Sequence, residues 1–277
     1  DKEHTELGIP FPSTSERFDL LEDALEIITR LMTGERVSYD GKVVSLRDAQ
    51  VLPRPVQSPR PPIWVGGTGP RRTLPLVARY ADVSSEQFSN VPSPSITPAH
   101  WLGLAKRINA LLAERPDLAG IVVTHGTSRL EETAFFLHLT IRSERPLAIV
   151  GAQRPSTGVS PDGPVNLLSA IRVAGSTEAR GKGALVVMDD RVISAREAVK
   201  VFPRSGGFDG AEMGVLGTIS EEGVTFFYQP TRRHTHAAEF DVSEVAALPR
   251  VGISVSYAGS PGVADGDAKG VVVATTG

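Results

Sequence analysis

The sequence predicts an α/β protein in which a parallel sheet is covered by helices on both faces. Three short apolar runs, "GIVV", "PLAIVGAQ" and "GALVVMDD", alternate with helical patterns in the second part of the chain. Strands that are buried on both faces of a parallel sheet have this continuous apolar character. Residues 1–82 follow a different pattern, so we treat them as a separate part.

The first part begins with an amphipathic helix and continues into a hairpin. In "SERFDLLEDALEIITRLMTG", Ser15 is the expected N-cap and Gly34 the expected end. Helical spacing brings five apolar side chains to one face: Phe18, Leu21, Leu25, Ile28 and Leu31. Two β-like runs around Asp40-Gly41 predict a hairpin, and a proline-rich stretch then leads into "IWVGGTG".

The second part supplies the helices that should cover the sheet. The segment "PAHWLGLAKRINALLAE" predicts a helix with Thr97 as N-cap and Pro98 as its first residue. Its inward face is expected to carry Trp101, Leu104, Ala105, Ile108, Leu111 and Leu112. Ser128 should open the next helix, and "VNLLSAIRVAG" forms another. Residues 231–249 are polar and aperiodic, which predicts a linker before two last strands, "RVGISVSY" and "GVVVATTG".

Composition excludes several classes of function. Of 277 residues, 40% are apolar and 22% charged, and the net charge of −3 gives no reason to expect nucleic acid or membrane as a partner. The chain has no cysteine, so disulfides, thiolate metal sites and a cysteine nucleophile are excluded. No metal site is expected, because the six histidines show no HExxH spacing and His234 and His236 read as a solvated basic loop. The start, "DKEHTELGIP", carries no signal-peptide pattern and reads as incomplete, so cytoplasm is the expected compartment.

A motif in the second part is specific enough to indicate a family. The stretch "VVTHGTSRLEETAFFL", followed by "RPLAIVGAQRPST", "DGPVNLLSAIRVAG" and "GALVVMDDRVISAREAVK", resembles the bacterial-type L-asparaginase family. The resemblance implies an asparaginase-like N-terminal α/β domain over residues 83–230, the linker 231–249, and the start of a second α/β domain at 250–277. We expect that second domain to be truncated.

The resemblance also implies a chemistry. Members hydrolyse asparagine to aspartate and ammonia through a threonine nucleophile, need no cofactor and form homo-oligomers. Thr127 matches the threonine of the HGT turn, and Lys200 in "AREAVK" matches the lysine that assists it. A threonine hydroxyl attacks only when a neighbouring group takes its proton, and a lysine amine held in a closed site can do so.

Two substitutions depart from the family pattern and predict impaired turnover. Ser128 stands where the family has an aspartate that meets the substrate amino group, and it forms an S-x-x-E capping box with Glu131. Ser93 matches the first residue of the family's Ser-Gln substrate pair, but Pro94 replaces the glutamine. A charge-assisted contact is worth about 1.5–3 kcal/mol, so we expect Ser128 to bind the substrate amino group more weakly than an aspartate would. Pro94, beside the substrate-binding Ser93, cannot donate a hydrogen bond and should weaken recognition of the substrate carboxylate. We also expect oligomer assembly to be disfavoured, because little of the second domain is present.

Residues 1–82 resemble a different family, the luciferase-like monooxygenases, through "GIPFPSTSERFDLLEDALEIITRLMTGE" and "LPRPVQSPRPPIWVGG". These enzymes use flavin or deazaflavin on a (β/α)8 barrel, and 82 residues can supply only a partial barrel. The resemblance implies that Gly66, Gly67 and Gly69 would receive the phosphate of FMN or a deazaflavin. A flavin- or deazaflavin-dependent oxidoreductase is therefore the alternative function, and an inactive chimeric remnant is a third.

The segment "IWVGGTG" has a second interpretation. It also resembles the opening strand and GGT turn of the asparaginase family, which makes Thr68 a second candidate nucleophile. This interpretation predicts that residues 63–68 pair with the strand at 121–124. The competing interpretation is a glycine turn retained from the barrel, with no reactive group.

Overall fold

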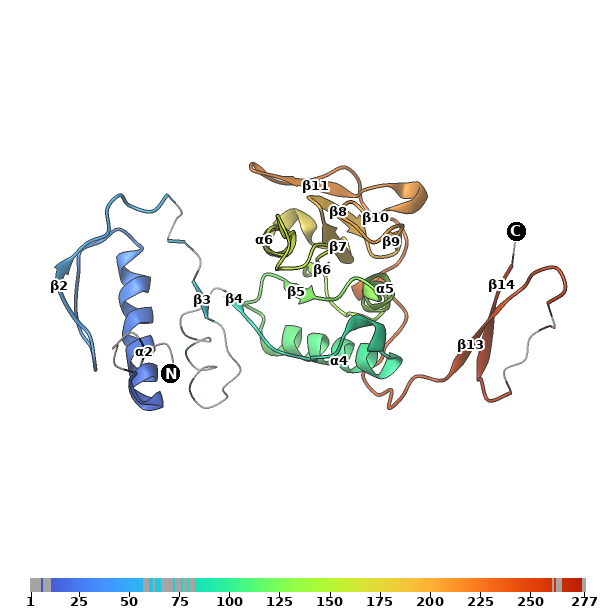
Figure 1. Ribbon diagram of the computed structural model, residues 1–277, viewed down its shortest axis with the longest axis horizontal. Helices are drawn as coiled ribbons and strands as arrows, with labels where there is room; N and C mark the ends of the chain where they lie inside the picture. The colour runs from blue at the N-terminus through green and yellow to red at the C-terminus, as the bar shows by residue number, and fades with distance from the viewer. Residues whose placement is uncertain are drawn as a thin grey trace. The chain divides into compact units, whose positions relative to one another are not determined.

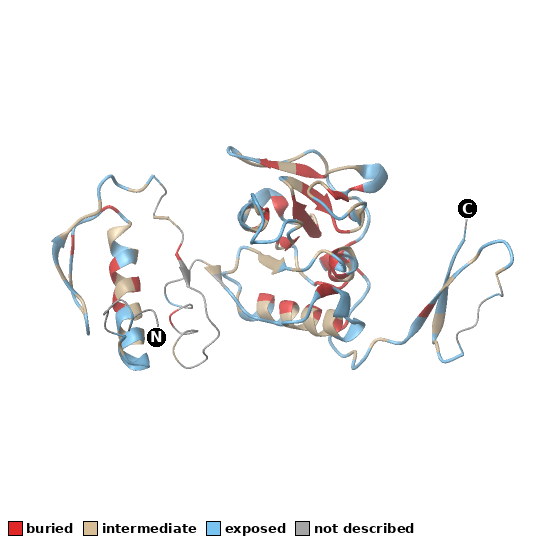
Figure 2. Ribbon diagram, viewed as in Figure 1, coloured by how far each residue is buried: buried red, intermediate tan, exposed pale blue. Residues whose placement is uncertain are grey.

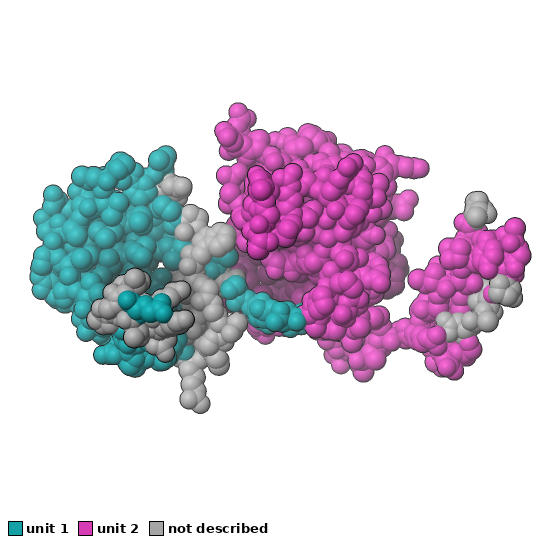
Figure 3. All heavy atoms as spheres, viewed as in Figure 1, with its two compact units in different colours: residues 1–90 teal, residues 91–277 magenta. Residues whose placement is uncertain are grey.

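The protein is described from a computed structural model that covers residues 6, 11–56, 60, 61, 63–65, 72, 76, 79, 83–260, 262 and 266–275. The chain divides into two compact units, residues 1–90 and 91–277, which Figure 3 shows in two colours. Each unit is described by itself.

In its described residues, the first unit contains one long helix and two small pairs of strands: α2 (Thr14–Leu31), β1 (Val37–Asp40), β2 (Ser45–Ala49), β3 (Trp64–Val65) and β4 (Val83–Ser84). The second unit contains three α-helices and the larger sheet: η1 (Ser93–Ser95), α4 (Pro98–Glu114), β5 (Ile121–Thr124), α5 (Leu130–Thr140), β6 (Leu147–Val150), α6 (Gly163–Gly175), η2 (Thr177–Ala179), β7 (Ala184–Met188), β8 (Arg191–Ser194), β9 (Val199–Lys200), β10 (Phe208–Asp209), η3 (Ala211–Met213), β11 (Gly217–Ser220), β12 (Gly223–Phe226), η4 (Thr235–Ala237), β13 (Val251–Val255) and β14 (Gly270–Ala274).

The helix of the first unit is the predicted one, with a different cap. The N-cap is Ser13, not Ser15: its hydroxyl accepts from the backbone amide of Glu16, whose carboxylate accepts from the Ser13 amide. This reciprocal pair satisfies two amides at the start of the helix, which Ser15 inside the first turn cannot do. Strands β1 and β2 form the predicted antiparallel hairpin.

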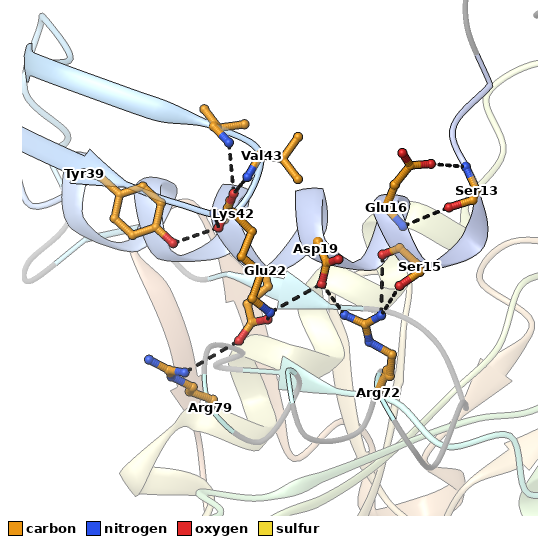
Figure 4. A network of polar contacts seen from close by, with 12 residues as sticks. Ser13, Ser15, Glu16, Asp19, Glu22, Tyr39, Lys42, Val43, Arg72 and Arg79 are labelled. Atoms are coloured by element: carbon orange, nitrogen blue, oxygen red, sulfur yellow. Dashed lines mark hydrogen bonds and ion pairs between the residues drawn. The ribbon is translucent and has the colours of Figure 1, made fainter.

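A buried carboxylate joins the helix to the hairpin, and Figure 4 labels three of the hairpin residues that donate to it, Tyr39, Lys42 and Val43. Asp23 of α2 is 1% exposed and accepts hydrogen bonds from the Tyr39 hydroxyl at 2.9 Å and from three backbone amides, those of Lys42, Val43 and Val44, at 2.6–3.1 Å. Burial alone would raise the pKa of Asp23, but the four donors outweigh it and lower the pKa to about 2. The hairpin tip therefore depends on this anion.

Residues 63–65 belong to the first unit. Ile63 is buried with Leu25 and Leu76, and β3 pairs in parallel with β4. The predicted pairing of residues 63–66 with the strand at 121–124 would join the two units, and it stays a prediction. A single parallel pair is what a barrel fragment can form, and no closed barrel is found in the described residues.

The second unit is built on a six-stranded sheet with the order β12-β11-β8-β7-β6-β5. Strands β5, β6 and β7 are parallel, as their apolar runs predicted. The other three strands run antiparallel to their neighbours, so the sheet is mixed and only its first half is parallel. The reversal occurs at Asp189 and Asp190, whose positive φ angles of 52° and 56° form a tight turn between β7 and β8. Two successive left-handed residues match the twist of a hairpin.

Helices cover both faces of this sheet, as predicted. Figure 1 shows α5 and α6 on opposite sides of the central strands, with α4 packed beside α5. Thr97 precedes α4 as the predicted N-cap. The residues of α4 that are buried are Leu102, Ala105, Ile108 and Leu112, so Trp101, Leu104 and Leu111 lie at the margin. Strands β6 and β7 are buried along their whole length at the centre of the unit (Figure 2).

Strand β5 differs from the prediction. It was expected to be buried on both faces, yet Ile121, Val122 and Val123 are only partly buried and Thr124 is exposed. The reason is its position: within the described part of the chain β5 is an edge strand that pairs with β6 alone. An edge strand lacks the neighbour that would cover its outer side.

The stretch at residues 231–249 is irregular, as predicted, but it is not a free linker. His234 and Thr235 are 5% and 2% exposed, and the Arg142 guanidinium donates to the carbonyl of Ala238 at 2.5 Å. The His234 ring lies 5.0 Å, centre to centre, from that of His138 in α5, which is itself 1% exposed. The prediction of a solvated loop around His234 was wrong, because this residue closes over a helix face.

Strands β13 and β14 form a separate parallel pair, as their apolar sequences suggested. Several of their side chains are exposed, among them Ile253 at 77% and Tyr257, after β13, at 60%. None of the helices that the structure describes is both long enough and apolar enough to span a membrane.

Candidate active site

The candidate site lies at the carboxyl end of β5, where the chain turns into α5. The amide of His125 still donates to the carbonyl of Val150 on β6, so the strand pairing extends up to the turn. Gly126, Thr127 and Ser128 form the turn, and α5 begins at Leu130. Loops at this edge of a parallel sheet are where such folds bind ligands.

The turn brings Thr127 and Lys200 together. The Lys200 ammonium donates to Thr127 Oγ1 at 2.7 Å, although 73 residues separate the two. The spatial prediction from the sequence is therefore confirmed. Lys200 is held by β9, a short strand that pairs with β10.

Glu131 reaches Lys200 instead of capping its own helix. Its carboxylate accepts a hydrogen bond from the backbone amide of Lys200. The helix starts at Leu130 with Arg129 as N-cap and without a side-chain cap, so the predicted box between Ser128 and Glu131 does not form. Glu131 is thus a site residue that was first assigned a purely local role.

Ser93 and Ser128 also meet at the turn. Ser93 is 9% exposed, and its Oγ accepts from the backbone amide of Ser128 at 3.2 Å. Gly126 makes this approach possible, because a Cβ at that position would lie 2.6 Å from Ser93 Oγ. Pro94 follows in the short 3-10 helix η1 and has no amide hydrogen to donate. The two predicted substrate-binding serines therefore lie side by side.

Gln153 is a neighbour of Thr127 that the sequence analysis missed. The Thr127 hydroxyl donates to Gln153 Oε1 at 3.3 Å, while the Gln153 Nε2 group is buried without a partner. Gln153 follows β6, the strand beside β5, so its position at the same sheet edge was a usable signal.

The loop that carries Gln153 is anchored by Asp162, which is 8% exposed. Its carboxylate accepts from the backbone amide of Gln153 at 2.9 Å and from that of Arg154 at 2.9 Å. Burial acts to raise the pKa of Asp162, but these amide donors outweigh it and hold the pKa below its usual value.

His125 supports the turn and has little freedom for proton transfer. Its Nε2 lies 3.0 Å from Thr133 Oγ1, which also accepts from the Trp101 indole at 2.8 Å. Its Nδ1 lies 2.7 Å from the carbonyl of Gly126. Burial lowers the pKa of His125, with the Gly126 carbonyl acting in the opposite direction. Both ring nitrogens are engaged, which favours a structural role.

A pocket of about 380 Å³ opens beside the turn. It is lined by the carboxyl ends of β5 and β6 and by the start of α6: Thr124, His125, Gly126, Val150, Gly151, Ala152, Gly163 and Leu167. A pocket of this size can hold a small molecule. The first residues of α6 contribute an N-terminus that favours a carboxylate.

The remaining predicted site residues lie outside the described part of the chain. These are Thr68 and the three glycines Gly66, Gly67 and Gly69. Across the described ranges, no group of three or more metal-ligating side chains comes together.

The arrangement has the parts that nucleophilic catalysis needs. The Thr127 hydroxyl lies within hydrogen-bond distance of the Lys200 amino group, and a pocket opens at Gly126, the residue before Thr127. Two serines and a helix start offer polar groups for a small ligand.

Two families of known sequences match this chain. The one described as "Asparaginase, N-terminal" matches residues 62–232, and the one described as "Luciferase-like monooxygenase" matches residues 1–89. The two matches overlap at residues 62–89, a stretch that includes the segment "IWVGGTG", which resembles both families.

Individual relatives are asparaginases by name, in agreement with the family match over residues 62–232. L-asparaginase 2 of Bacillus subtilis is 46% identical over 210 residues, which cover 74% of this chain and 56% of that protein. Glutaminase-asparaginase of Pseudomonas fluorescens is 39% identical over 209 residues, covering 74% of this chain and 58% of that protein. The crystal structure of a probable cytoplasmic L-asparaginase from Campylobacter jejuni, 40% identical, superimposes with a TM-score of 0.66 over 73% of this chain and 68% of its own. The chain thus spans little more than half the length of these two curated relatives.

Proposed function

Because the chain belongs to the asparaginase family, we propose that its second unit hydrolyses the side-chain amide of asparagine, with Thr127 as nucleophile. The observation that carries the proposal is the 2.7 Å contact between Lys200 Nζ and Thr127 Oγ1 at a sheet edge that also holds a pocket.

The reaction follows from the groups at this edge. Thr127 Oγ1 attacks the amide carbon while its proton passes to the uncharged amine of Lys200, and the carbonyl π electrons move to oxygen. Collapse of this intermediate breaks the C–N bond, and the proton leaves on ammonia. Water then cleaves the Thr127 ester by the same exchange of protons with Lys200, which releases aspartate. No cofactor enters either step.

Substrate recognition is where this chain departs from its family. Ser128 offers a hydroxyl in place of a carboxylate, and Pro94 offers no donor, so we expect a raised KM for asparagine. Some relatives are named glutaminase-asparaginase, which makes glutamine the second substrate to test.

Thr68 remains a proposed second nucleophile. It lies outside the described residues, and its support is that the family match begins at residue 62 and includes it.

The test is ammonia release from asparagine and glutamine by the full chain. We expect Thr127→Ala and Lys200→Met to reduce the rate about 100-fold or more, because each removes a group that the attack requires. Thr231→Ala, at an exposed position, is the matched control. Parent-like rates in both site variants would refute the assigned roles. Thr68→Ala tests the second nucleophile separately.

A second candidate function rests on the match of residues 1–89 to luciferase-like monooxygenases. Under it, FMN or a deazaflavin would bind the first unit. Absorbance at flavin wavelengths in the purified protein, or its appearance on adding FMN, would support this function, and a featureless spectrum after both treatments would count against it.

We also propose a small-molecule substrate in the cytoplasm as the setting of the reaction. The Campylobacter jejuni relative is described as a probable cytoplasmic enzyme. Mass measurement in solution would determine whether the chain forms the homo-oligomer that its family resemblance implies.

A further inference from the structure

Gln153 completes a chain of three polar groups with Lys200 and Thr127. Lys200 Nζ donates to Thr127 Oγ1 at 2.7 Å, and Thr127 Oγ1 donates to Gln153 Oε1 at 3.3 Å. We propose that the side-chain amide of Gln153 determines in which direction the hydrogen bonds between these three groups run. Gln153 is thereby a positioning residue for the Thr127 hydroxyl. The inference rests on the amide hydrolysis proposed above.

In the observed direction, Thr127 cannot give its proton to Lys200. The single hydroxyl hydrogen points at Gln153 Oε1, while Lys200 supplies the other hydrogen bond to Thr127. A hydroxyl has one hydrogen and two lone pairs, so both contacts are satisfied. This direction holds the nucleophile in place without activating it.

Rotation of the Gln153 side-chain amide by about half a turn reverses the donor and acceptor roles in these hydrogen bonds. Gln153 Nε2 then donates to Thr127 Oγ1, and the hydroxyl hydrogen is free to point at Lys200 Nζ. The amide oxygen and nitrogen occupy nearly the same space, so the rotation needs no other movement.

The burial of Nε2 makes this rotation inexpensive. In the observed direction the Nε2 group is buried and has no partner. A buried donor without a partner is unfavourable, so the observed orientation is not strongly preferred. Rotation gives the donor a partner in Thr127.

The rest of Gln153 is fixed, which confines its freedom to the amide group. Its backbone amide donates to Asp162 at 2.9 Å, as does that of Arg154. The side chain of Asn166 donates to the carbonyl of Gly151 at 3.1 Å, two residues earlier in the same loop. The loop therefore holds the amide against Thr127 in either orientation.

The orientation should follow the charge of Lys200. A Lys200 ammonium can only donate, which leaves Gln153 Oε1 as the acceptor for the hydroxyl hydrogen, whereas an uncharged amine can accept that hydrogen and lets Gln153 donate through Nε2. Three other titratable groups lie near these three side chains. Glu131 accepts from the backbone amide of Lys200, Asp162 accepts from that of Gln153, and the His125 ring contacts the carbonyl of Gly126 in the turn.

Two substitutions separate positioning from simple space filling. Gln153→Glu keeps the shape but, when ionised, only accepts, so it locks the hydroxyl away from Lys200. The methionine of Gln153→Met has a similar length but neither donates a hydrogen bond to Thr127 nor accepts one from it. We expect kcat for ammonia release to fall about 100-fold in Gln153→Glu and about 10-fold in Gln153→Met, with KM changed less than about threefold. Gln229→Glu, on the surface and paired with Lys182, is the matched control.

A residue that only fills space gives the opposite order, because the isosteric Gln153→Glu would then be the better tolerated variant. That order, or a change confined to KM, would overturn the inference. Thermal unfolding of each variant ensures that the rates come from folded protein.

A second measurement does not depend on turnover. The side-chain ¹⁵N resonance of Gln153 should differ between the parent and Lys200→Met at one fixed pH, because loss of the amino group changes the hydrogen bonds of Thr127 and hence those of Gln153. An unchanged resonance overturns the inference. If the parent releases no ammonia, the proposed function fails and this resonance alone decides the role of Gln153.

Discussion

Lys200 Nζ lies 2.7 Å from Thr127 Oγ1, and the backbone amide of Lys200 is bound by Glu131, four residues after Thr127. The turn into α5 and the first residues of this helix therefore supply both the proposed nucleophile and the carboxylate that binds the amide of its partner. The geometry of this pair depends on the start of α5, and the following predictions test how that geometry is maintained.

Glu131→Ala should lower the rate of ammonia release about 10- to 100-fold. The substitution removes the acceptor of the Lys200 amide, and a hydrogen bond to a charged group is worth about 1.5–3 kcal/mol. Glu132→Ala is a close control, since Glu132 pairs with Arg129 on the exposed side of the helix. Equal effects of the two substitutions would mean that Glu131 contributes only to the helix.

Gly151→Ala should displace Thr127, the proposed nucleophile. A Cβ at this position would lie 2.7 Å from the carbonyl of His125 and 2.9 Å from Thr127 Cγ2. Overpacking of this kind costs about 1–3 kcal/mol, and we expect both stability and the rate of ammonia release to fall. Gly175→Ala, where no atom lies within 4 Å, should leave both unchanged. Parent-like kinetics in Gly151→Ala would show that the turn can move without loss.

Asp23→Asn should destabilise the first unit by roughly 2–3 kcal/mol, because a neutral amide replaces a buried anion that accepts four hydrogen bonds. Amide exchange at Val43 and Val44 measures the effect within the full chain. Asp19→Asn should cost much less, since the ion pairs that Asp19 forms with the described residues Arg72 and Lys42 lie at the surface (Figure 4).

The same carboxylate predicts a loss of stability in acid. The folded pKa of Asp23 is about 2, below its ordinary value of 3.8. Its contribution is therefore fully present above about pH 4 and is lost as the pH falls toward 2. Unfolding of the first unit in Asp23→Asn should lack this part of the pH dependence.

The histidine pair predicts a second pH dependence, in the second unit. Burial, with the nearby charges of His234 and Arg196, lowers the pKa of His138 from 6.5 to about 3. Between these values the unfolded chain binds more protons than the folded one, so stability falls as the pH decreases below about 6.5. The slope is about 1.4 kcal/mol per pH unit for one such group.

His138→Asn should flatten that slope. The asparagine carbonyl can still accept from the amide of Ala184, which donates to His138 Nδ1 at 3.2 Å in the parent. Denaturant unfolding at pH 8 provides the baseline, and the two proteins should diverge between pH 6.5 and 4. An unchanged slope would assign the dependence to other groups.

The parallel half of the sheet could be predicted because its strands are continuous apolar runs. The antiparallel half could not, because it depends on Asp189 and Asp190 adopting left-handed conformations that few residues other than glycine favour. The cap of α2 was misplaced for a local reason: "PSTSER" offers two serines, and only Ser13 has a glutamate three residues later.

The site was predictable where a motif spans it. Thr127 and Lys200 were assigned by resemblance, and their contact agrees with that assignment. Gln153 and the contact of Glu131 with Lys200 were not found, because both arise from tertiary packing between segments that share no local pattern. Gln153 could have been proposed from its place after β6, next to the strand that carries Thr127.

Strand β5 has a free outer side in the described sheet. Its backbone amides should therefore exchange with deuterated water at two different rates. The amides of Ile121 and His125 donate to carbonyls on the β6 side, at Pro146 and Val150. Alternate residues of a strand point the other way, so the amides of Val122 and Thr124 face outward and should exchange quickly. Slow exchange at these two positions would reveal that a further strand completes the sheet in solution.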